Sequence, residues 1–208
     1  MQNVWPILIY AAKSRSGKDF AGSELQRCST SQMRYYRAPI ADSLKDFCWH
    51  YFKQYGVRLK SEYEYDPEIR EDELDIEGGG NVVDLWIKVG EFFRGLDKEF
   101  WISRWWTQVR SSTQGSQPEI IYPVITDWRF DCELEYLQKL VAAKQLLGFT
   151  TVRINVAADK GVAKASDGKV TVKKFDLEVC NDFTPLFQKE VRLIHEHVRY
   201  ACGVGAHK

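Results

Sequence analysis

The sequence predicts an α/β fold in which helices flank a parallel sheet. Residues 5–10 and 120–125 are short, nearly continuous apolar runs, which are typical of strands buried on both faces. Residues 151–156 form a third strand candidate, rich in β-branched side chains. The intervening segments repeat apolar residues at helical spacing. Because strands that alternate with helices are joined by right-handed crossovers, this order indicates parallel strands.

In the first half of the chain, strand 5–10 carries Pro6 near its start, where a missing N–H does least harm. A polar, glycine-containing turn follows, and then a helix from about residue 17 to 27. Residues 33–37 predict a second strand. Pro39 then opens a helix, whose apolar face is formed by Ile40, Leu44, Phe47, Cys48 and Tyr51.

An acidic segment, residues 61–80, interrupts this pattern and ends in three glycines. We interpret it as an exposed insertion, because runs of like charge are usually solvated. The functional alternative is an acidic docking surface.

In the second half, helical spacing covers residues 82–93, 100–109 and 133–147, and Gly148 is the predicted stop of the last of these. Pro123 weakens the strand prediction at 120–125. A final helix should run to about residue 200, capped by Asp182 or Thr184.

Composition narrows the function classes. The 208 residues are 44% hydrophobic, which suits one packed domain. Lys+Arg and Asp+Glu both number 29, so the formal net charge is +0, which argues against binding to bulk nucleic acid. The five dispersed cysteines suit reduced thiols. The first apolar run is too short for a membrane span. We therefore expect no membrane partner and a cytoplasmic location, in a host's cytoplasm if the protein is viral.

The turn after the first strand has the pattern of a phosphate-binding loop, G-x-x-x-x-G-K-[ST]. Backbone N–H groups at the start of the following helix favour an anion there. Gly17 lets the backbone approach phosphates, and Lys18 can reach the β- and γ-phosphates of ATP. The other reading is an ordinary polar turn. The predicted nucleotide-binding residues are Ala12, Lys13, Ser14, Arg15, Ser16, Gly17, Lys18 and Asp19.

Two positions depart from that pattern. Ala12 replaces the first glycine, which is tolerable at negative φ. Asp19 replaces the Ser or Thr whose hydroxyl binds Mg²⁺. Because a carboxylate beside phosphates is repelled unless a cation lies between them, Asp19 predicts a bound Mg²⁺, held directly or through water.

The loop sequence from Ser14 to Phe20, S-R-S-G-K-D-F, resembles that of P-loop kinases of small phosphorylated metabolites. The likeness is greatest to bacteriophage deoxynucleoside monophosphate (dNMP) kinases, which also carry S-G-K-D. Further blocks match in order, at residues 38–45, 90–101, 126–129 and 181–182. Animal phosphomevalonate kinases share the S-G-K-D-F loop and a D-x-R, so phosphomevalonate is the alternative acceptor.

The resemblance implies a single three-layer P-loop kinase domain over residues 1–208. Residues 38–112 would form an acceptor-binding helical insertion and 157–178 a short lid. Arg94 would hold the acceptor phosphate, with Arg37 and Arg104 as weaker candidates, and Asn181 would lie near the donor base. A lysine-rich hairpin is the plain alternative to the lid.

Two residues after strand 120–125 complete the predicted catalytic set with Lys18 and Arg94. Asp127 would hold Mg²⁺ through water or orient the acceptor, or else cap the helix that follows. Arg129 would contact a phosphate, or pair with Asp127. A guanidinium suits that task because it grips phosphate oxygens in a bidentate way.

The sequence thus predicts a dNMP kinase that uses ATP and Mg²⁺. The rivals are another small-molecule kinase, such as phosphomevalonate kinase, and a non-catalytic nucleotide-binding regulatory protein. Whether the protein forms a homodimer is left open. The aromatic run at residues 100–106 is interpreted as core rather than as a stacking platform for nucleic acid. His195 and His197 lack zinc-site spacing and are expected at the surface.

Overall fold

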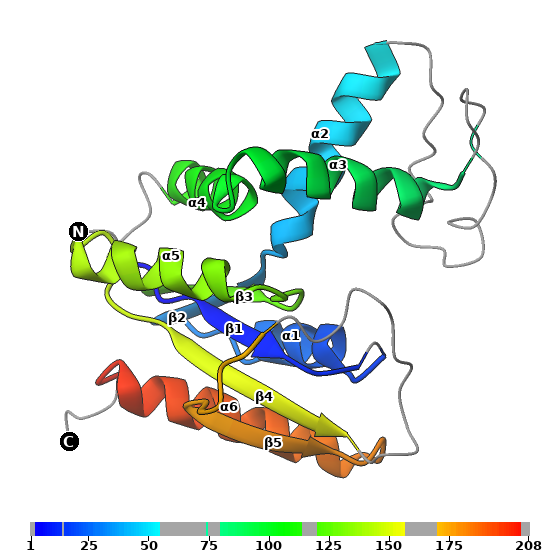
Figure 1. Ribbon diagram of the computed structural model, residues 1–208. Helices are drawn as coiled ribbons and strands as arrows, with labels where there is room; N and C mark the ends of the chain where they lie inside the picture. The colour runs from blue at the N-terminus through cyan, green and yellow to red at the C-terminus, as the bar shows by residue number, and fades with distance from the viewer. Residues whose placement is uncertain are drawn as a thin grey trace. The chain divides into compact units, whose positions relative to one another are not determined.

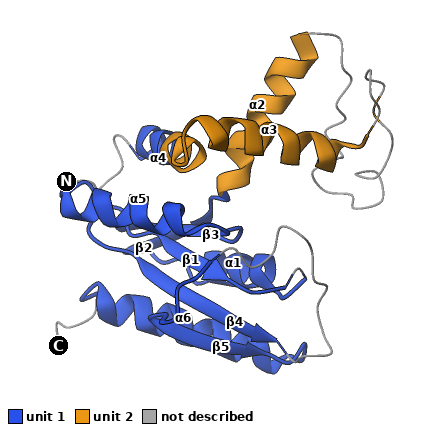
Figure 2. Ribbon diagram, viewed as in Figure 1, with its two compact units in different colours: residues 1–39, 106–208 blue, residues 40–105 orange. Residues whose placement is uncertain are grey.

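The computed structural model describes residues 3–13, 15–54, 74, 80–113, 120–156 and 170–204. It divides into two compact units (Figure 2), which are considered separately. Unit 1 comprises Met1–Pro39 and Trp106–Lys208, and unit 2 comprises Ile40–Trp105. Most of the acidic insertion and residues 157–169 of the predicted lid lie outside the described residues.

Unit 1 is built on a five-stranded sheet in which all neighbours are parallel, as predicted. The strand order is β2-β3-β1-β4-β5, so β1 lies at the centre (Figure 1). The strand bounds are β1 Ile7–Tyr10, β2 Met33–Arg37, β3 Ile120–Ile125, β4 Thr150–Val156 and β5 Leu177–Asn181.

Helices cover both faces of this sheet. Ile7 and Ile9 of β1 share one hydrophobic core with Leu25 of α1 (Lys18–Arg27) and Val191 of α6 (Leu186–Ala201). The opposite face is covered by α5 (Asp131–Ala142), as Figure 1 shows. The arrangement is compatible with a three-layer sandwich, which is the form expected when parallel strands bury both faces.

Unit 2 contains α2 (Ile40–Gln54), α3 (Val82–Leu96) and the start of α4 (Phe100–Ser112). Aromatic rings pack together in this unit: the Phe93 ring stacks on Phe100 at 4.6 Å between centroids, and Phe47 meets Phe93 edge-on at 5.0 Å. The Trp101 indole donates to the Gly90 carbonyl at 3.0 Å. The prediction that the 100–106 aromatics are core is confirmed for the tryptophans, because all three are buried. Tyr51, predicted on the apolar face of α2, is 44% exposed.

The predicted end of helix 133–147 is wrong. The helix α5 stops at Ala142, and Lys144 adopts a left-handed conformation with φ 58°. Gly148 serves a different purpose, because a Cβ there would lie 2.7 Å from the Trp5 ring. The glycine therefore marks a close approach between β4 and the start of the chain rather than a helix stop.

Prolines shape the central strands. Pro6 precedes β1, which is shorter than the apolar run that predicted it. Pro123 lies inside β3, an internal strand. It is tolerated there because the ladder between β3 and β1 begins one residue later, at Val124.

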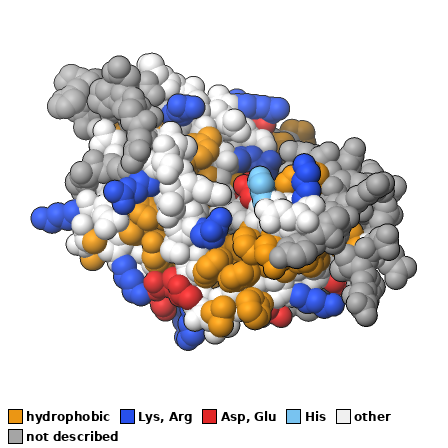
Figure 3. Space-filling model, turned by 90° about the horizontal axis from the view of Figure 1, so that it is seen from above, with side chains coloured by type: hydrophobic (Ala, Val, Ile, Leu, Met, Phe, Trp, Pro, Cys, Tyr) orange, Lys and Arg blue, Asp and Glu red, His pale blue; other side chains and the backbone are white. Residues whose placement is uncertain are grey.

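None of the described helices combines the length and the apolar character that crossing a membrane requires. On the face drawn in Figure 3, the Lys and Arg side chains of the described residues lie in separate groups and form no continuous stripe.

His195 is not a surface residue as predicted. The residue lies on α6 and is half-buried, with Nδ1 2.9 Å from the Tyr35 hydroxyl. Burial lowers the pKa of His195 from its ordinary value of 6.5, and the nearby Arg199 lowers it further while Glu196 opposes the shift. The lowered pKa favours the neutral ring, which shares one hydrogen bond between Nδ1 and the Tyr35 hydroxyl.

We expect acid to destabilise the protein through this histidine. Below its ordinary pKa of 6.5 the unfolded chain takes up a proton that the folded chain still refuses, so the free energy of unfolding falls with the pH. Urea unfolding gives the free energy of unfolding of wild type and of His195→Gln between about pH 7.5 and about pH 5.5. The contribution of His195 should change this free energy by less than ~1.4 kcal/mol per pH unit, the slope for one full proton. Equal slopes for the two proteins would contradict the assignment.

Candidate functional site

The predicted phosphate-binding loop connects the carboxyl end of β1, the central strand, to the first residue of α1, Lys18. Two left-handed residues shape it, Arg15 with φ 58° and Gly17 with φ 87°. The Ser16 hydroxyl donates to the Lys13 carbonyl oxygen, and Lys18 Nζ donates to the same oxygen at 3.2 Å. The loop is therefore closed by its own side chains, with Lys18 folded toward it. Ser14 lies outside the described residues.

Asn181, at the end of β5, is hydrogen-bonded to the backbone of this loop. Its side chain is 4% exposed, and Nδ2 donates to the Ser16 carbonyl oxygen at 3.0 Å. Its Oδ1 accepts the backbone N–H of Phe183 at 2.8 Å. Buried amides need such partners, so the contact fixes both the loop and the turn into α6. The structure thus places Asn181 against the loop, and a contact with a nucleotide base stays a prediction.

The predicted cap of the last helix is wrong, because the N-cap of α6 is Pro185 and no side chain of the described residues caps the helix; Asp182 and Thr184 form hydrogen bonds in the turn before it. The Asp182 carboxylate accepts the Thr184 N–H at 3.0 Å, and the Thr184 hydroxyl accepts the Leu186 N–H at 3.2 Å. These bonds satisfy backbone groups in the turn that leads into the helix.

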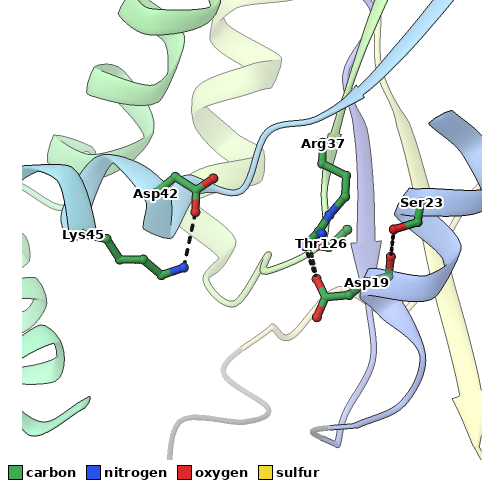
Figure 4. Close-up of polar contacts among 6 residues, drawn as sticks. All are labelled: Asp19, Ser23, Arg37, Asp42, Lys45 and Thr126. Carbon is green, nitrogen blue, oxygen red and sulfur yellow. Dashed lines mark hydrogen bonds and ion pairs between the residues drawn. The ribbon is translucent and has the colours of Figure 1, made fainter. Parts of the chain in front are cut away.

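Asp19, in the first turn of α1, contacts the ends of two neighbouring strands (Figure 4). Its Oδ1 accepts a hydrogen bond from Thr126 Oγ1 at 2.9 Å. The same oxygen forms an ion pair with Arg37 Nη2 at 2.8 Å. Thr126 is 3% exposed, whereas the Asp19 side chain is 75% exposed. Among the described residues, no hydrogen bond reaches Asp19 Oδ2. One carboxylate oxygen is therefore held and the other faces outward.

Gly22, one turn further along α1, permits this arrangement. A Cβ at that position would lie 2.8 Å from Thr126 Cγ2 and 3.4 Å from Arg37 Cγ. Both side chains must pass over this helix turn to reach Asp19. Sequence reasoning missed Gly22 and the role of Thr126, because a lone glycine or threonine carries no pattern of its own.

Asp127 and Arg129 follow β3 in the next loop. The buried Glu133 carboxylate accepts the backbone N–H groups of Arg129 at 3.0 Å and Phe130 at 3.1 Å. Because α5 begins at Asp131 and Phe130 is its N-cap, the alternative that Asp127 caps this helix is wrong. Arg129 is exposed and Asp127 is half-buried at the end of β3.

Three buried rings pack together at the carboxyl end of β1. Tyr10 stacks on Phe175 at 5.7 Å between centroids, and Trp128 meets both rings edge-on at 5.9 Å. Phe175 belongs to the part of the predicted lid that the structure describes. The same segment is tied to the start of α5, where Asp131 Oδ1 accepts the Thr171 N–H at 2.9 Å.

The structure brings Lys18, Asp19, Arg37, Thr126 and Asn181 together around the start of α1. The remaining predicted arginines, Arg94 and Arg104, belong to unit 2, on α3 and α4. Arg94 is half-buried and Arg104 is exposed. Their predicted role toward an acceptor phosphate stays a prediction.

The donor atoms at this site fit Mg²⁺. Within the described residues, no three His, Cys, Asp or Glu side chains gather into a metal cage. Magnesium does not need one beside a nucleotide, since phosphates and water supply most of its oxygens and one or two carboxylates complete the set. Asp19 offers one such carboxylate oxygen, Oδ2, at the phosphate-binding loop.

A scan against models of protein families and a search of curated proteins both found no match to the chain.

Proposed function

We propose that this protein is a kinase that transfers the γ-phosphoryl group of ATP to a small phosphorylated acceptor, with a dNMP as the first candidate. The observation that carries the proposal is the loop itself. It leaves the central strand of a parallel sheet, where ligands of such folds bind, and ends in Gly17, Lys18 and Asp19 at the start of a helix. The amino-acid pattern and the backbone geometry thus support the same chemistry.

Each residue of the loop has a task in this reaction. The N-terminal turn of α1 carries the positive end of the helix dipole, which favours phosphate. Lys18 moves from the Lys13 carbonyl to the β- and γ-phosphates and stabilises the charge that develops during transfer. Asp19 would hold Mg²⁺, which would supply positive charge to the phosphate oxygens. Asn181 keeps the loop backbone in position through Ser16.

The acceptor needs cations of its own. By the resemblance noted above, Arg94 binds the acceptor phosphate, and Arg129 touches one of the two phosphates. Asp127, which follows a buried strand, orients the acceptor or a metal-bound water. Phosphoryl transfer requires such positioning more than covalent help from the protein.

A panel of acceptors tests the named reaction. We expect coupled ADP release with at least one of the four dNMPs, with kcat/KM far above that for phosphomevalonate. Turnover of phosphomevalonate alone would overturn the named acceptor but keep the kinase class. Calorimetric binding of ATP without turnover on any monophosphate would favour a nucleotide-binding regulatory protein instead.

Arg94→Ala tests the acceptor contact. We expect the acceptor KM to rise about tenfold or more, the loss of a charge-assisted bond, while the affinity for ATP stays within about twofold. The matched control is Lys88→Ala, which removes an exposed cation from the same helix, α3, and should change neither constant. Equal losses of affinity for ATP and for the acceptor would show that Arg94 supports the structure of unit 2 and does not bind the acceptor.

A further inference from the structure

The carboxylate at the phosphate-binding loop already has a cationic partner within the protein. Asp19 and Arg37 are joined at 2.8 Å, and both side chains are open to solvent, at 75% and 39% exposure. An ion pair this exposed contributes little, because water screens it and two flexible side chains must be ordered. It can therefore be exchanged for a stronger cation at low cost.

The second hydrogen bond to Asp19 Oδ1 comes from a buried side chain rather than an exposed one. Thr126 is almost fully buried at the end of β3, and its hydroxyl donates to Asp19 Oδ1 at 2.9 Å. Thr126 directly follows the last residue of β3, and Gly22 leaves room for its side chain beside α1. Thr126 is thus placed to hold the carboxylate whether or not Arg37 remains.

A cation beside Asp19 competes with any metal that binds there. Mg²⁺ carries two charges and bonds carboxylate oxygen directly or through its water, whereas the guanidinium carries one charge spread over three nitrogens. Two cations on the two oxygens of one carboxylate repel each other, so the ion pair with Arg37 weakens when a metal binds Oδ2.

We propose that Arg37 is an exchangeable counter-ion of Asp19, displaced by the Mg²⁺ that arrives with the nucleotide and thereby released to bind the phosphate of the acceptor. This inference rests on the proposed kinase function and extends it. Metal–nucleotide binding would then prepare the acceptor site, so the two substrates bind with positive coupling. Thr126 acts as a positioning residue that orients Asp19 with and without the metal.

The proposal predicts opposite effects from removing the two partners of one oxygen. Arg37→Gln should tighten metal binding by about twofold to fivefold, the range of an exposed ion pair, because a competitor is gone. Thr126→Val keeps the shape but removes the hydroxyl, so it should weaken metal binding severalfold. Thr126→Ser restores the hydroxyl and should restore the affinity. Two merely structural side chains would change the affinity in the same direction.

Titration of Mn²⁺ into the protein–ADP complex, followed by electron paramagnetic resonance, measures this without turnover. The matched control is Arg34→Gln, which removes the same charge from an exposed position on the same strand, β2. Thermal melting of each variant confirms folding. If Arg37→Gln leaves the Mn²⁺ affinity unchanged or lowers it, the exchange is overturned while nucleotide binding stands. If wild type binds no Mn²⁺–ADP, the proposed kinase function falls and the exchange with it.

A second measurement addresses the acceptor. Calorimetry with each of the four dNMPs should show tighter binding when Mg²⁺ and ADP are present, by about twofold to fivefold, the range of an exposed ion pair. In Asp19→Asn this gain in dNMP affinity should disappear. Arg37 then has no carboxylate partner at residue 19, so it can bind the dNMP phosphate before Mg²⁺ and ADP are added. A gain of the same size in wild type and Asp19→Asn would overturn the coupling through this pair.

Discussion

Replacing Lys18 with alanine is expected to lower kcat/KM by about 10²-fold to 10³-fold, the loss seen when a donor to transition-state charge is removed. The side chain makes a 3.2 Å hydrogen bond to the Lys13 carbonyl oxygen at the first turn of α1. That bond is one of two to the same oxygen, because the Ser16 hydroxyl donates there as well. The loop should therefore keep its shape without Lys18, and the loss should fall on catalysis.

The matched control for this experiment is Lys189→Ala, which removes an exposed lysine from α6. Both variants should melt within a few degrees of wild type, since surface changes cost little stability. Steady-state kinetics with ATP and the best dNMP give the comparison. Near-parent kcat/KM in Lys18→Ala would show that the loop does not bind the transferred phosphoryl group.

Gly17→Ala is expected to disable the loop through backbone geometry. At φ 87° an alanine is strained, at a cost of about 1–2 kcal/mol. Its Cβ would also lie 2.5 Å from Asn181 Nδ2 and 2.9 Å from Phe187 Cε1. Because Asn181 is buried and donates a hydrogen bond to the Ser16 carbonyl, the loop backbone must shift rather than Asn181. A displacement near 1 Å at a reacting centre costs about 10²-fold in rate.

Gly95→Ala is the control glycine, because no atom lies within 4 Å of the Cβ it would add, and α3 tolerates alanine. It should be neutral or slightly stabilising. Nucleotide affinity by calorimetry and kcat/KM by ADP release are measured for both variants. Wild-type affinity and rate in Gly17→Ala would exclude the proposed role of the left-handed turn.

Much of the fold was predictable because its signals are local. Buried parallel strands are continuous apolar runs, and the run at residues 120–125 gave β3 with its exact bounds. Helix ends were less accessible. The helix α5 ends at Ala142 with Lys144 at positive φ two residues later, while Gly148 packs against Trp5, a contact between distant parts of the chain.

The candidate site divides in the same way. The loop could be read from contiguous residues, since Gly17, Lys18 and Asp19 form a pattern with a mechanism. Thr126, Gly22 and the buried position of Asn181 became visible only in three dimensions. Their contacts join residues that lie far apart in sequence, and the single chain carries no signal for such pairs. Asp19, which replaces the Ser or Thr of the loop pattern, was the one local sign of a cation beside the loop.

The position of β1 has a consequence for how the chain acquires its structure. Ile7 pairs with Val124 on one side and with Thr150 on the other, so the central strand leaves the ribosome long before either neighbour exists. Unit 2 is one continuous stretch of chain and can form while β1 still lacks its neighbouring strands. Such distant pairings fold slowly and expose apolar strands in the meantime. We expect the amides of β1 to gain protection from hydrogen exchange late in refolding, and chains truncated before β3 to aggregate through Ile7, Leu8 and Ile9.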